Sequence, residues 1–133
     1  MQRLNCVLLV DDDEITNFVN ESLINDLGAA QEVLVTTGGQ QALDLITLRW
    51  QQGSCLPNLI LLDMNMPGMN GIEFLEEYEQ LEEKLRKSVI VVMLTSSNNP
   101  ADVAKIGHTN MADLLNKPLT ETKLEHVVEK HFA

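Results

Sequence analysis

Hydrophobic residues along the chain form five short runs, separated by longer segments in which apolar positions recur every three or four residues. The short runs have the length of strands, and several of them lack polar alternation. Such runs are typical of strands that are buried on both faces of a parallel sheet. The predicted strands are residues 6–10, 33–36, 59–62, 89–94 and 111–115.

The segments between these runs have the spacing of amphipathic helices. Their apolar stripes are, in chain order, Ile15, Phe18, Val19, Leu23 and Leu27; Ala42, Leu45, Ile46 and Leu48; Phe74, Leu75, Tyr78, Leu81 and Leu85; Val103 and Ile106 in a short helix that starts near Pro100; and Leu124, Val127, Val128 and His131 after an N-cap at Thr120. Strands that alternate with helices predict a doubly wound α/β fold with a parallel sheet. We expect residues 1–133 to form a single domain.

Polar side chains follow four of the predicted strands at the point where each strand ends. Three acids, Asp11 to Asp13, follow the first strand, and Asp63 follows the third. Thr95 and Ser96 follow the fourth strand, and Lys117 follows the fifth. Because the carboxyl ends of parallel strands share one edge of the sheet, where open α/β folds bind ligands, we expect these groups to converge.

A cluster of carboxylates at this edge predicts a magnesium site. Crowding Asp11, Asp12 and Asp63 together costs electrostatic energy, which a hard divalent cation with oxygen ligands would relieve. An aspartate beside Mg²⁺ can attack a phosphoryl group, so Asp63 is the candidate nucleophile. Thr95, or less readily Ser96, could then bind one phosphoryl oxygen and Lys117 another.

Each of these residues also has a simpler interpretation that the sequence leaves open. Asp11 and Glu14 could form an N-terminal box for the first helix. Thr95 could cap the end of its strand, and Lys117 could be a solvated surface lysine. Asp13 has no evident catalytic role and is a candidate cap of the first helix.

Composition narrows the range of functions. The chain has 133 residues, a formal net charge of -11 and 44% hydrophobic residues. The apolar content argues against a disordered acidic tail, and the negative charge argues against direct nucleic-acid binding. The apolar runs are far shorter than the roughly 20 residues that span a bilayer, and no cleavable leader is evident, so we expect no membrane insertion and a cytoplasmic location. Cys6 and Cys55 indicate neither a disulfide framework nor a zinc site, and Cys6 is predicted to fill the core.

The residues at the strand ends resemble those of the receiver domains of two-component response regulators. The resemblance covers essentially the whole chain, and its motifs are VLLVDDD at residues 7–13, LLDMNMPGMNG at 61–71, MLTS at 93–96 and KP at 117–118. It implies a flavodoxin-like receiver fold, with a five-stranded parallel sheet in the order 2-1-3-4-5 and five helices. It also implies that Asp63 is the phosphorylated aspartate.

The same resemblance assigns roles to the residues around Asp63. Asp12 would bind Mg²⁺ directly, Asp11 would hold the water shell of the metal, and the backbone carbonyl of Asn65 would complete the site. Thr95 would be the switch hydroxyl, and Lys117 would bind the phosphate. In the family, the proline at position 118 follows a cis peptide bond, whereas sequence alone favours trans.

Two features depart from the family pattern. Many receivers have Tyr or Phe three residues before the lysine, where this chain has Leu114, so an aromatic rotation cannot carry the signal. Residues 98–110 are mostly polar, and Asn110 and Met111 replace a common Gly-Ala pair. The surface that contacts downstream partners could therefore differ from that of better-known relatives.

The expected function is a phosphorylation-controlled switch that receives its phosphoryl group from a histidine kinase or a phosphotransfer protein. The chain's own histidines, His108, His126 and His131, are scattered and do not suit a donor. We expect slow autodephosphorylation at most rather than enzymatic turnover, and output through protein contacts at the face of the fourth helix, fifth strand and fifth helix. Either the chain is a stand-alone receiver or it is part of a longer protein.

Two other functions remain to be distinguished from this one. A pseudo-receiver would keep the fold and bind a partner without being phosphorylated, and Leu114 supports that alternative. A phosphatase of the haloacid-dehalogenase type would need a second aspartate two residues after the nucleophile. This chain has Asn65 at that position.

Overall fold

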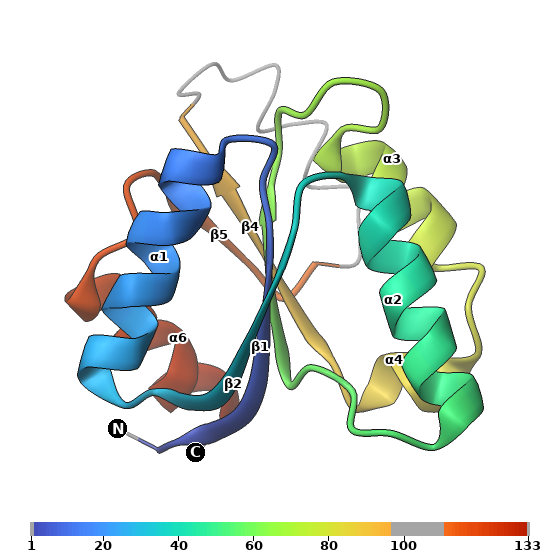
Figure 1. The fold of residues 1–133 in the computed structure, drawn as a ribbon, viewed down its shortest axis with the longest axis horizontal. Coiled ribbons are helices and arrows are strands. Elements are labelled where there is room, and N and C mark those ends of the chain that lie inside the picture. Colours follow the sequence, from blue (N-terminus) through green and yellow to red (C-terminus); the bar gives the residue numbers. More distant parts are fainter. Residues whose placement is uncertain (1, 97–110, 133) are drawn as a thin grey trace.

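The apolar runs form a five-stranded parallel sheet in the computed structural model, which describes residues 2–96 and 111–132 (Figure 1). The strands are β1 (Leu4–Val10), β2 (Ala30–Thr36), β3 (Leu59–Asp63), β4 (Ile90–Thr95) and β5 (Asp113–Asn116). Their order is β2-β1-β3-β4-β5, and every neighbouring pair is parallel. The predicted fold class and strand order are confirmed. The order reverses beside β1, which opens the crevice where folds of this kind bind ligands.

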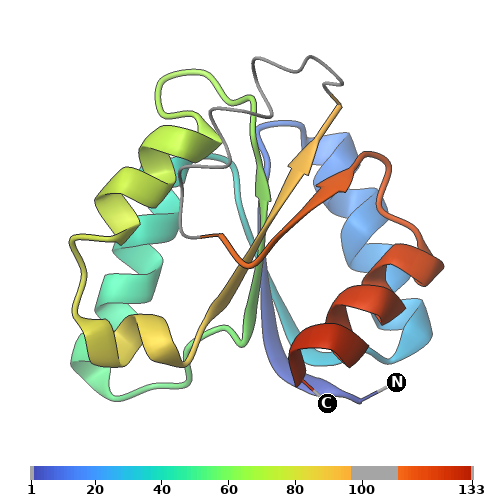
Figure 2. The same ribbon diagram turned by 180° about the vertical axis from the view of Figure 1, so that it is seen from behind.

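Helices cover both faces of the sheet, as the two opposite views show (Figure 1, Figure 2). Helices α1 (Glu14–Leu27) and α6 (Glu121–Phe132) lie on one face, and α2 (Gly39–Gln52), α3 (Gly71–Tyr78) and α4 (Glu83–Lys87) lie on the other. Successive residues of a strand point to opposite faces. Leu8 and Val10 of β1 therefore belong to the core under α2 and α3, whereas Val7 and Leu9 belong to the core under α1 and α6.

The strand boundaries differ from the predicted ones by a few residues. The largest difference is in β2, which starts at Ala30 rather than at residue 33. This strand lies at the edge of the sheet, so Gln31 and Glu32 can be exposed and polar without leaving the strand. The predicted fourth helix, from Pro100 through Val103 and Ile106, lies outside the described residues. Thr120 caps the last helix as predicted, because its hydroxyl oxygen accepts the backbone N–H of Lys123 at 3.2 Å.

The third predicted helix is not continuous. It ends after Tyr78, and α4 begins at Glu83. One tertiary and one local contact lie at the break between them: the indole N–H of Trp50 donates to Glu82 at 3.2 Å, and Nε of Arg86 donates to the carbonyl of Leu81 at 3.1 Å. Leu85 is buried in the same core as Tyr78 despite the break. The apolar spacing therefore continues across the break, and the sequence pattern predicts a single helix.

The apolar spacing predicts that the first three apolar residues of helix α1 face the core, but they face solvent. Ile15 is 74% exposed, Phe18 is 69% exposed and Val19 is also exposed, whereas the buried residues of this helix are Asn17, Asn20 and Ile24. Buried asparagines and exposed large apolar residues on one helix reverse the usual arrangement. The amino-terminal half of α1 therefore presents an apolar surface to solvent, and it lies beside the acidic end of β1.

Among the described residues, no helix combines the length and the apolar composition that crossing a membrane requires.

Candidate functional site

Four strand ends bring the predicted site residues together at the carboxyl edge of the sheet. Asp11 follows β1, Asp63 ends β3, Thr95 ends β4 and Lys117 follows β5. The ammonium nitrogen of Lys117 lies 3.1 Å from Oδ2 of Asp11 and 3.0 Å from Oδ1 of Asp63. Lys117 is thus not the solvated surface lysine that sequence alone allowed, because its charge lies between two buried carboxylates.

The pKa values of Asp63 and Lys117 are both shifted, because these charged side chains are largely removed from solvent. Burial raises the pKa of Asp63, and the neighbouring charge of Asp11 raises it further, against the opposing effect of Lys117. Burial alone would lower the pKa of Lys117, but its hydrogen bonds to Asp63 and Asp11 outweigh that effect and raise it. Lys117 is therefore a fixed positive charge beside Asp63, which suits it to bind an anionic group.

Asp11, Asp12 and Asp63 form an acidic cluster whose carboxylate oxygens lie within 4.8 Å of one another. The cluster combines two buried carboxylates with the exposed side chain of Asp12. Hard oxygen ligands with one side open to water are the donor set that Mg²⁺ prefers, because Mg²⁺ keeps several of its own waters. The donor chemistry therefore fits the metal that the sequence predicted. Asn65 lies next to this cluster, and its backbone N–H donates to Oδ1 of Asp63 at 3.3 Å.

The loop that carries the acidic triplet is fixed by hydrogen bonds. Asp13 is the N-cap of α1: one carboxylate oxygen accepts the backbone N–H of Ile15 at 2.9 Å and the other accepts the hydroxyl of Thr16 at 3.0 Å. The alternative of a box formed by Asp11 and Glu14 is wrong, because Oδ1 of Asp11 accepts the backbone N–H of Asp13 instead. Capping by Asp13 leaves the carboxylates of Asp11 and Asp12 for the cluster.

The opposite side of the site is held by β4, β5 and α6. The backbone N–H of Lys117 donates to the carbonyl of Thr95 at 2.8 Å, and the peptide bond between Lys117 and Pro118 is cis, as the resemblance implied. The side chain of Lys123 donates to the carbonyls of Asn116 and Pro118, at 2.7 and 3.0 Å. Carbonyls on both sides of Lys117 are therefore tied to α6.

The loop after β3 needs a glycine at position 71. The backbone N–H of Gly71 donates to the carbonyl of Met64 at 2.9 Å, and a Cβ at this position would lie 3.0 Å from the carbonyl oxygen of Asp63. Any side chain would therefore press on the backbone of the candidate phosphoacceptor. Asn70 then starts α3 with a capping box, in which Asn70 and Glu73 exchange hydrogen bonds.

Sequence reasoning missed two residues that support the site. Asn17 donates from its side-chain amide to the carbonyl of Asp11 at 2.8 Å, and Lys123 fixes the segment around Lys117. The signal for Asn17 is a polar residue between the apolar positions Ile15 and Phe18, which periodicity alone assigns to a solvent face. Lys123 has no distinctive signal in the sequence.

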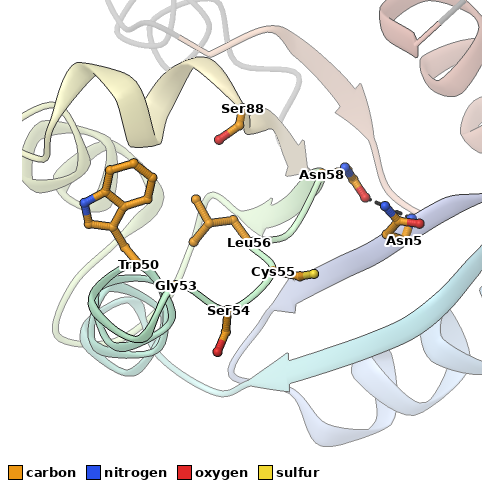
Figure 3. A pocket seen from close by; sticks show the side chains of 8 residues that line it. All are labelled: Asn5, Trp50, Gly53, Ser54, Cys55, Leu56, Asn58 and Ser88. Carbon is orange, nitrogen blue, oxygen red and sulfur yellow. Dashed lines mark hydrogen bonds between the residues drawn. The ribbon is translucent and has the colours of Figure 1, made fainter.

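A separate cavity of about 530 Å³ opens at the other end of the sheet (Figure 3). Trp50, Leu56 and Ser88 line it, and Asn58 accepts the backbone N–H groups of Asn5 and Cys6 at its edge. Its described lining residues carry no carboxylate or amine. Among the described residues, the clustered charged groups therefore lie at the carboxyl edge rather than in this cavity.

Comparisons with known proteins agree with this geometry. A solved structure of a two-component response regulator from Cytophaga hutchinsonii superposes with a TM-score of 0.87, at 32% identity and with 97% of each chain covered. Sensor protein GacS of Pseudomonas syringae pv. syringae is 33% identical over 93% of this chain, which spans only 13% of that protein. The probable methanogenesis regulatory protein FilR2 of Methanothrix harundinacea is 30% identical over 93% of this chain and 79% of its own length.

The family model that describes the response regulator receiver domain matches residues 7–129. That span includes every strand end at the site, from Asp11 to Lys117. The chain therefore belongs to the family of response regulator receiver domains of two-component systems.

Proposed function

We propose that this receiver domain, residues 1–133, is a phosphorylation-controlled switch in which Asp63 accepts a phosphoryl group from a phosphohistidine on another protein. The observation that carries the proposal is the position of Lys117, whose ammonium lies 3.0 Å from Asp63 and 3.1 Å from Asp11. A partly buried cation beside one carboxylate of an acidic cluster is arranged to hold an incoming anion at that carboxylate.

The transfer uses groups that end or follow the neighbouring strands β3, β4 and β5. A carboxylate oxygen of Asp63 forms a bond to phosphorus, and the P–N bond of the phosphohistidine breaks as the imidazole nitrogen keeps its electron pair and takes a proton from solvent. Lys117 binds one phosphoryl oxygen, and the hydroxyl of Thr95 donates to another. Asp63 acts as the nucleophile, and the other groups stabilise the charge that the phosphoryl oxygens carry.

Asp11, Asp12 and Asp63, with the backbone carbonyl of Asn65, are the residues that would hold Mg²⁺. The bound metal would offset the negative charges of the carboxylates and the phosphoryl group as they approach each other. Asp11 and Asp12 contribute by holding their carboxylates within 4.8 Å of the Asp63 oxygen before the donor arrives.

Dephosphorylation would be slow, and the domain would not act as a phosphatase. Rapid turnover of an aspartyl phosphate needs a group that activates water, and position 65 has an asparagine where such an enzyme would have an aspartate. The complete set of nucleophile, acids and lysine also argues against a pseudo-receiver that is not phosphorylated.

A histidine kinase or a phosphotransfer protein would approach over α1. Ile15, Phe18 and Val19 are exposed beside the acidic loop, and an apolar hollow of about 240 Å³ lies between α1 and the Lys117 segment. Exposed apolar side chains beside a reaction site mark a contact surface for a protein partner. We place this transfer in the cytoplasm.

Output would pass through protein contacts at the face that includes β5 and α6, which lie next to Thr95 and Lys117. The fourth predicted helix, which we assigned to the same face, lies outside the described residues. Leu114 occupies the position of the usual aromatic residue in β5 and packs partly buried against the core. The signal would therefore pass through Thr95 and the backbone of β4 and β5 without an aromatic rotation.

Phosphorylation by a small phosphodonor tests the proposal. Purified protein is incubated with phosphoramidate, with and without Mg²⁺, and separated on a phosphate-affinity gel. We expect a retarded band that requires Mg²⁺, is absent for Asp63→Asn and is unchanged for Asp44→Asn, an exposed aspartate that pairs with Gln40 on α2. No retarded band in the wild type, or the same band in Asp63→Asn, would refute the proposal.

A further inference from the structure

Asn17 binds both ends of the acidic triplet. Its side-chain amide nitrogen donates to the carbonyl of Asp11 at 2.8 Å, and its backbone N–H donates to the carbonyl of Asp13 at 3.1 Å. Asp12, which contributes the exposed carboxylate of the cluster, lies between these two anchored residues. The bond to Asp13 is a main-chain helix bond that most residues would make here, so the contact specific to the asparagine is the one from its side chain to Asp11.

The cost of burying this asparagine indicates that it is not present for packing. Asn17 is 3% exposed, and its Oδ1 has no hydrogen-bond partner. A buried acceptor without a partner lowers stability, and asparagine is a poor helix former compared with leucine. A leucine would fill the same buried position without the unpaired Oδ1, but it would remove the donor to the carbonyl of Asp11. The benefit of Asn17 must therefore lie in the hydrogen bond that it makes.

That hydrogen bond completes the anchoring of Asp11. The backbone N–H of Asp11 donates to the carbonyl of Thr36 in β2 at 3.2 Å, and its carbonyl accepts from Asn17 in α1. The backbone N–H and the carbonyl of Asp11 are thus bonded to two different elements, β2 and α1. The direction of the Asp11 side chain toward Asp63 is fixed as a result, because the backbone that carries it cannot rotate freely.

We propose that Asn17 is a positioning residue for the divalent cation site. By holding the carbonyl of Asp11, its side chain sets the position of the Asp11 and Asp12 carboxylates relative to Asp63 before the cation binds. The inference rests on the proposed function, since it concerns the same metal site, and it adds a residue that touches neither the metal nor the phosphoryl group.

Asn20 provides a matched control for this role. It lies one turn further along α1, it is also an asparagine, and it is 6% exposed. It forms no side-chain hydrogen bond with the acidic loop in the part of the chain that the structure describes. Replacing either asparagine by leucine changes the polarity of a buried position on α1, but only the change at Asn17 removes a contact to Asp11.

Mg²⁺ binding by isothermal titration calorimetry, without phosphodonor, tests the inference directly. The proteins are the wild type, Asn17→Leu, Asn17→Ala as a smaller replacement that cannot overpack, and Asn20→Leu, each checked for folding by circular dichroism. We expect Mg²⁺ affinity to fall about threefold to tenfold in both Asn17 variants, which is the size expected for losing one hydrogen bond. Asn20→Leu should bind Mg²⁺ like the wild type.

The dependence of the phosphorylation rate on Mg²⁺ separates positioning from general loss of structure. A positioning role raises the Mg²⁺ concentration needed for half the maximal rate and leaves the rate at saturating Mg²⁺ unchanged. Unchanged Mg²⁺ affinity in the folded Asn17 variants, or an equal loss in Asn20→Leu, would overturn the inference. A wild type that binds no Mg²⁺ would instead overturn the proposed metal site itself.

Discussion

Lys117 joins the two buried carboxylates of the site. Its single positive charge is shared between Asp11 and Asp63, which are both about 4% exposed and would otherwise be two unpaired negative charges in a buried position. The same contacts make Lys117 a competitor of Mg²⁺, because cation and lysine bind the same carboxylates. The lysine must give up part of its contact with Asp63 when a phosphoryl group is attached there.

Lys117→Met should separate the stabilising effect of Lys117 on the buried carboxylates from its competition with Mg²⁺. Without Mg²⁺ we expect the free energy of unfolding to fall by about 1–3 kcal/mol, because two buried carboxylates lose their partner. Mg²⁺ should restore more stability to this variant than to the wild type, because nothing competes for the carboxylates. Urea unfolding with and without Mg²⁺ measures both quantities, and a variant as stable as the wild type without Mg²⁺ would contradict the pairing.

The two cysteines should differ strongly in reactivity. Cys6 is buried in β1, and burial, together with nearby Glu32, raises the pKa of its thiol to about 12, whereas Cys55 is exposed. Since the thiolate is the reactive form, we expect a disulfide reagent at neutral pH to label Cys55 in the native protein and both residues after unfolding. Labelling of Cys6 in the native state, located by peptide mapping, would show that β1 is less protected than the fold indicates.

At the scale of elements, β5 and α6 are joined by one cluster of charges. Asp113 accepts from Lys130 at 3.1 Å and contacts the ring nitrogen of His131 at 3.4 Å. Burial works to raise the pKa of Asp113, but hydrogen bonds from the Leu114 backbone, Lys130 and His131 outweigh it and lower the pKa. A lowered pKa means that the folded state favours the carboxylate, so the cluster stabilises the fold above the ordinary pKa of aspartate.

Asp113→Asn should therefore destabilise the protein in a pH-dependent way. Near neutral pH we expect a loss of about 0.5–1 kcal/mol, because Lys130 is half exposed and its contact is screened by solvent. The difference from the wild type should shrink below about pH 4, as Asp113 in the wild type becomes protonated. Chemical denaturation of both proteins across this range measures it, and a difference that grows at low pH would contradict the assignment.

Most elements could be predicted because the buried strands are nearly continuous apolar runs, and the ends of these runs located Asp11, Asp63, Thr95 and Lys117. Periodicity failed where tertiary contacts decide the outcome. The break after Tyr78 depends on Trp50, which lies far away in sequence, and the exposed Ile15 and Phe18 depend on Asn17 taking the buried side of α1. Such contacts between distant residues leave no periodic signal in a single sequence.

For the whole molecule, the net charge of -11 has two separate components. Three carboxylates at the edge of the sheet converge within 4.8 Å, and others lie on exposed helix surfaces such as those of Glu76 and Glu77 on α3. The first group pairs with Lys117 and lies at neighbouring strand ends that could hold a phosphoryl group. We therefore expect the phosphoryl group to bond to one residue of that group, Asp63.

Chemical trapping of the phosphorylated residue tests this central claim most directly. The protein is phosphorylated with phosphoramidate and Mg²⁺, reduced with borohydride, which converts an aspartyl phosphate to homoserine, and sequenced by tandem mass spectrometry after digestion. We expect homoserine at position 63. Homoserine at Asp11, Asp12 or Asp13 with Asp63 unchanged, or a phosphoryl group found on a histidine alone, would contradict it.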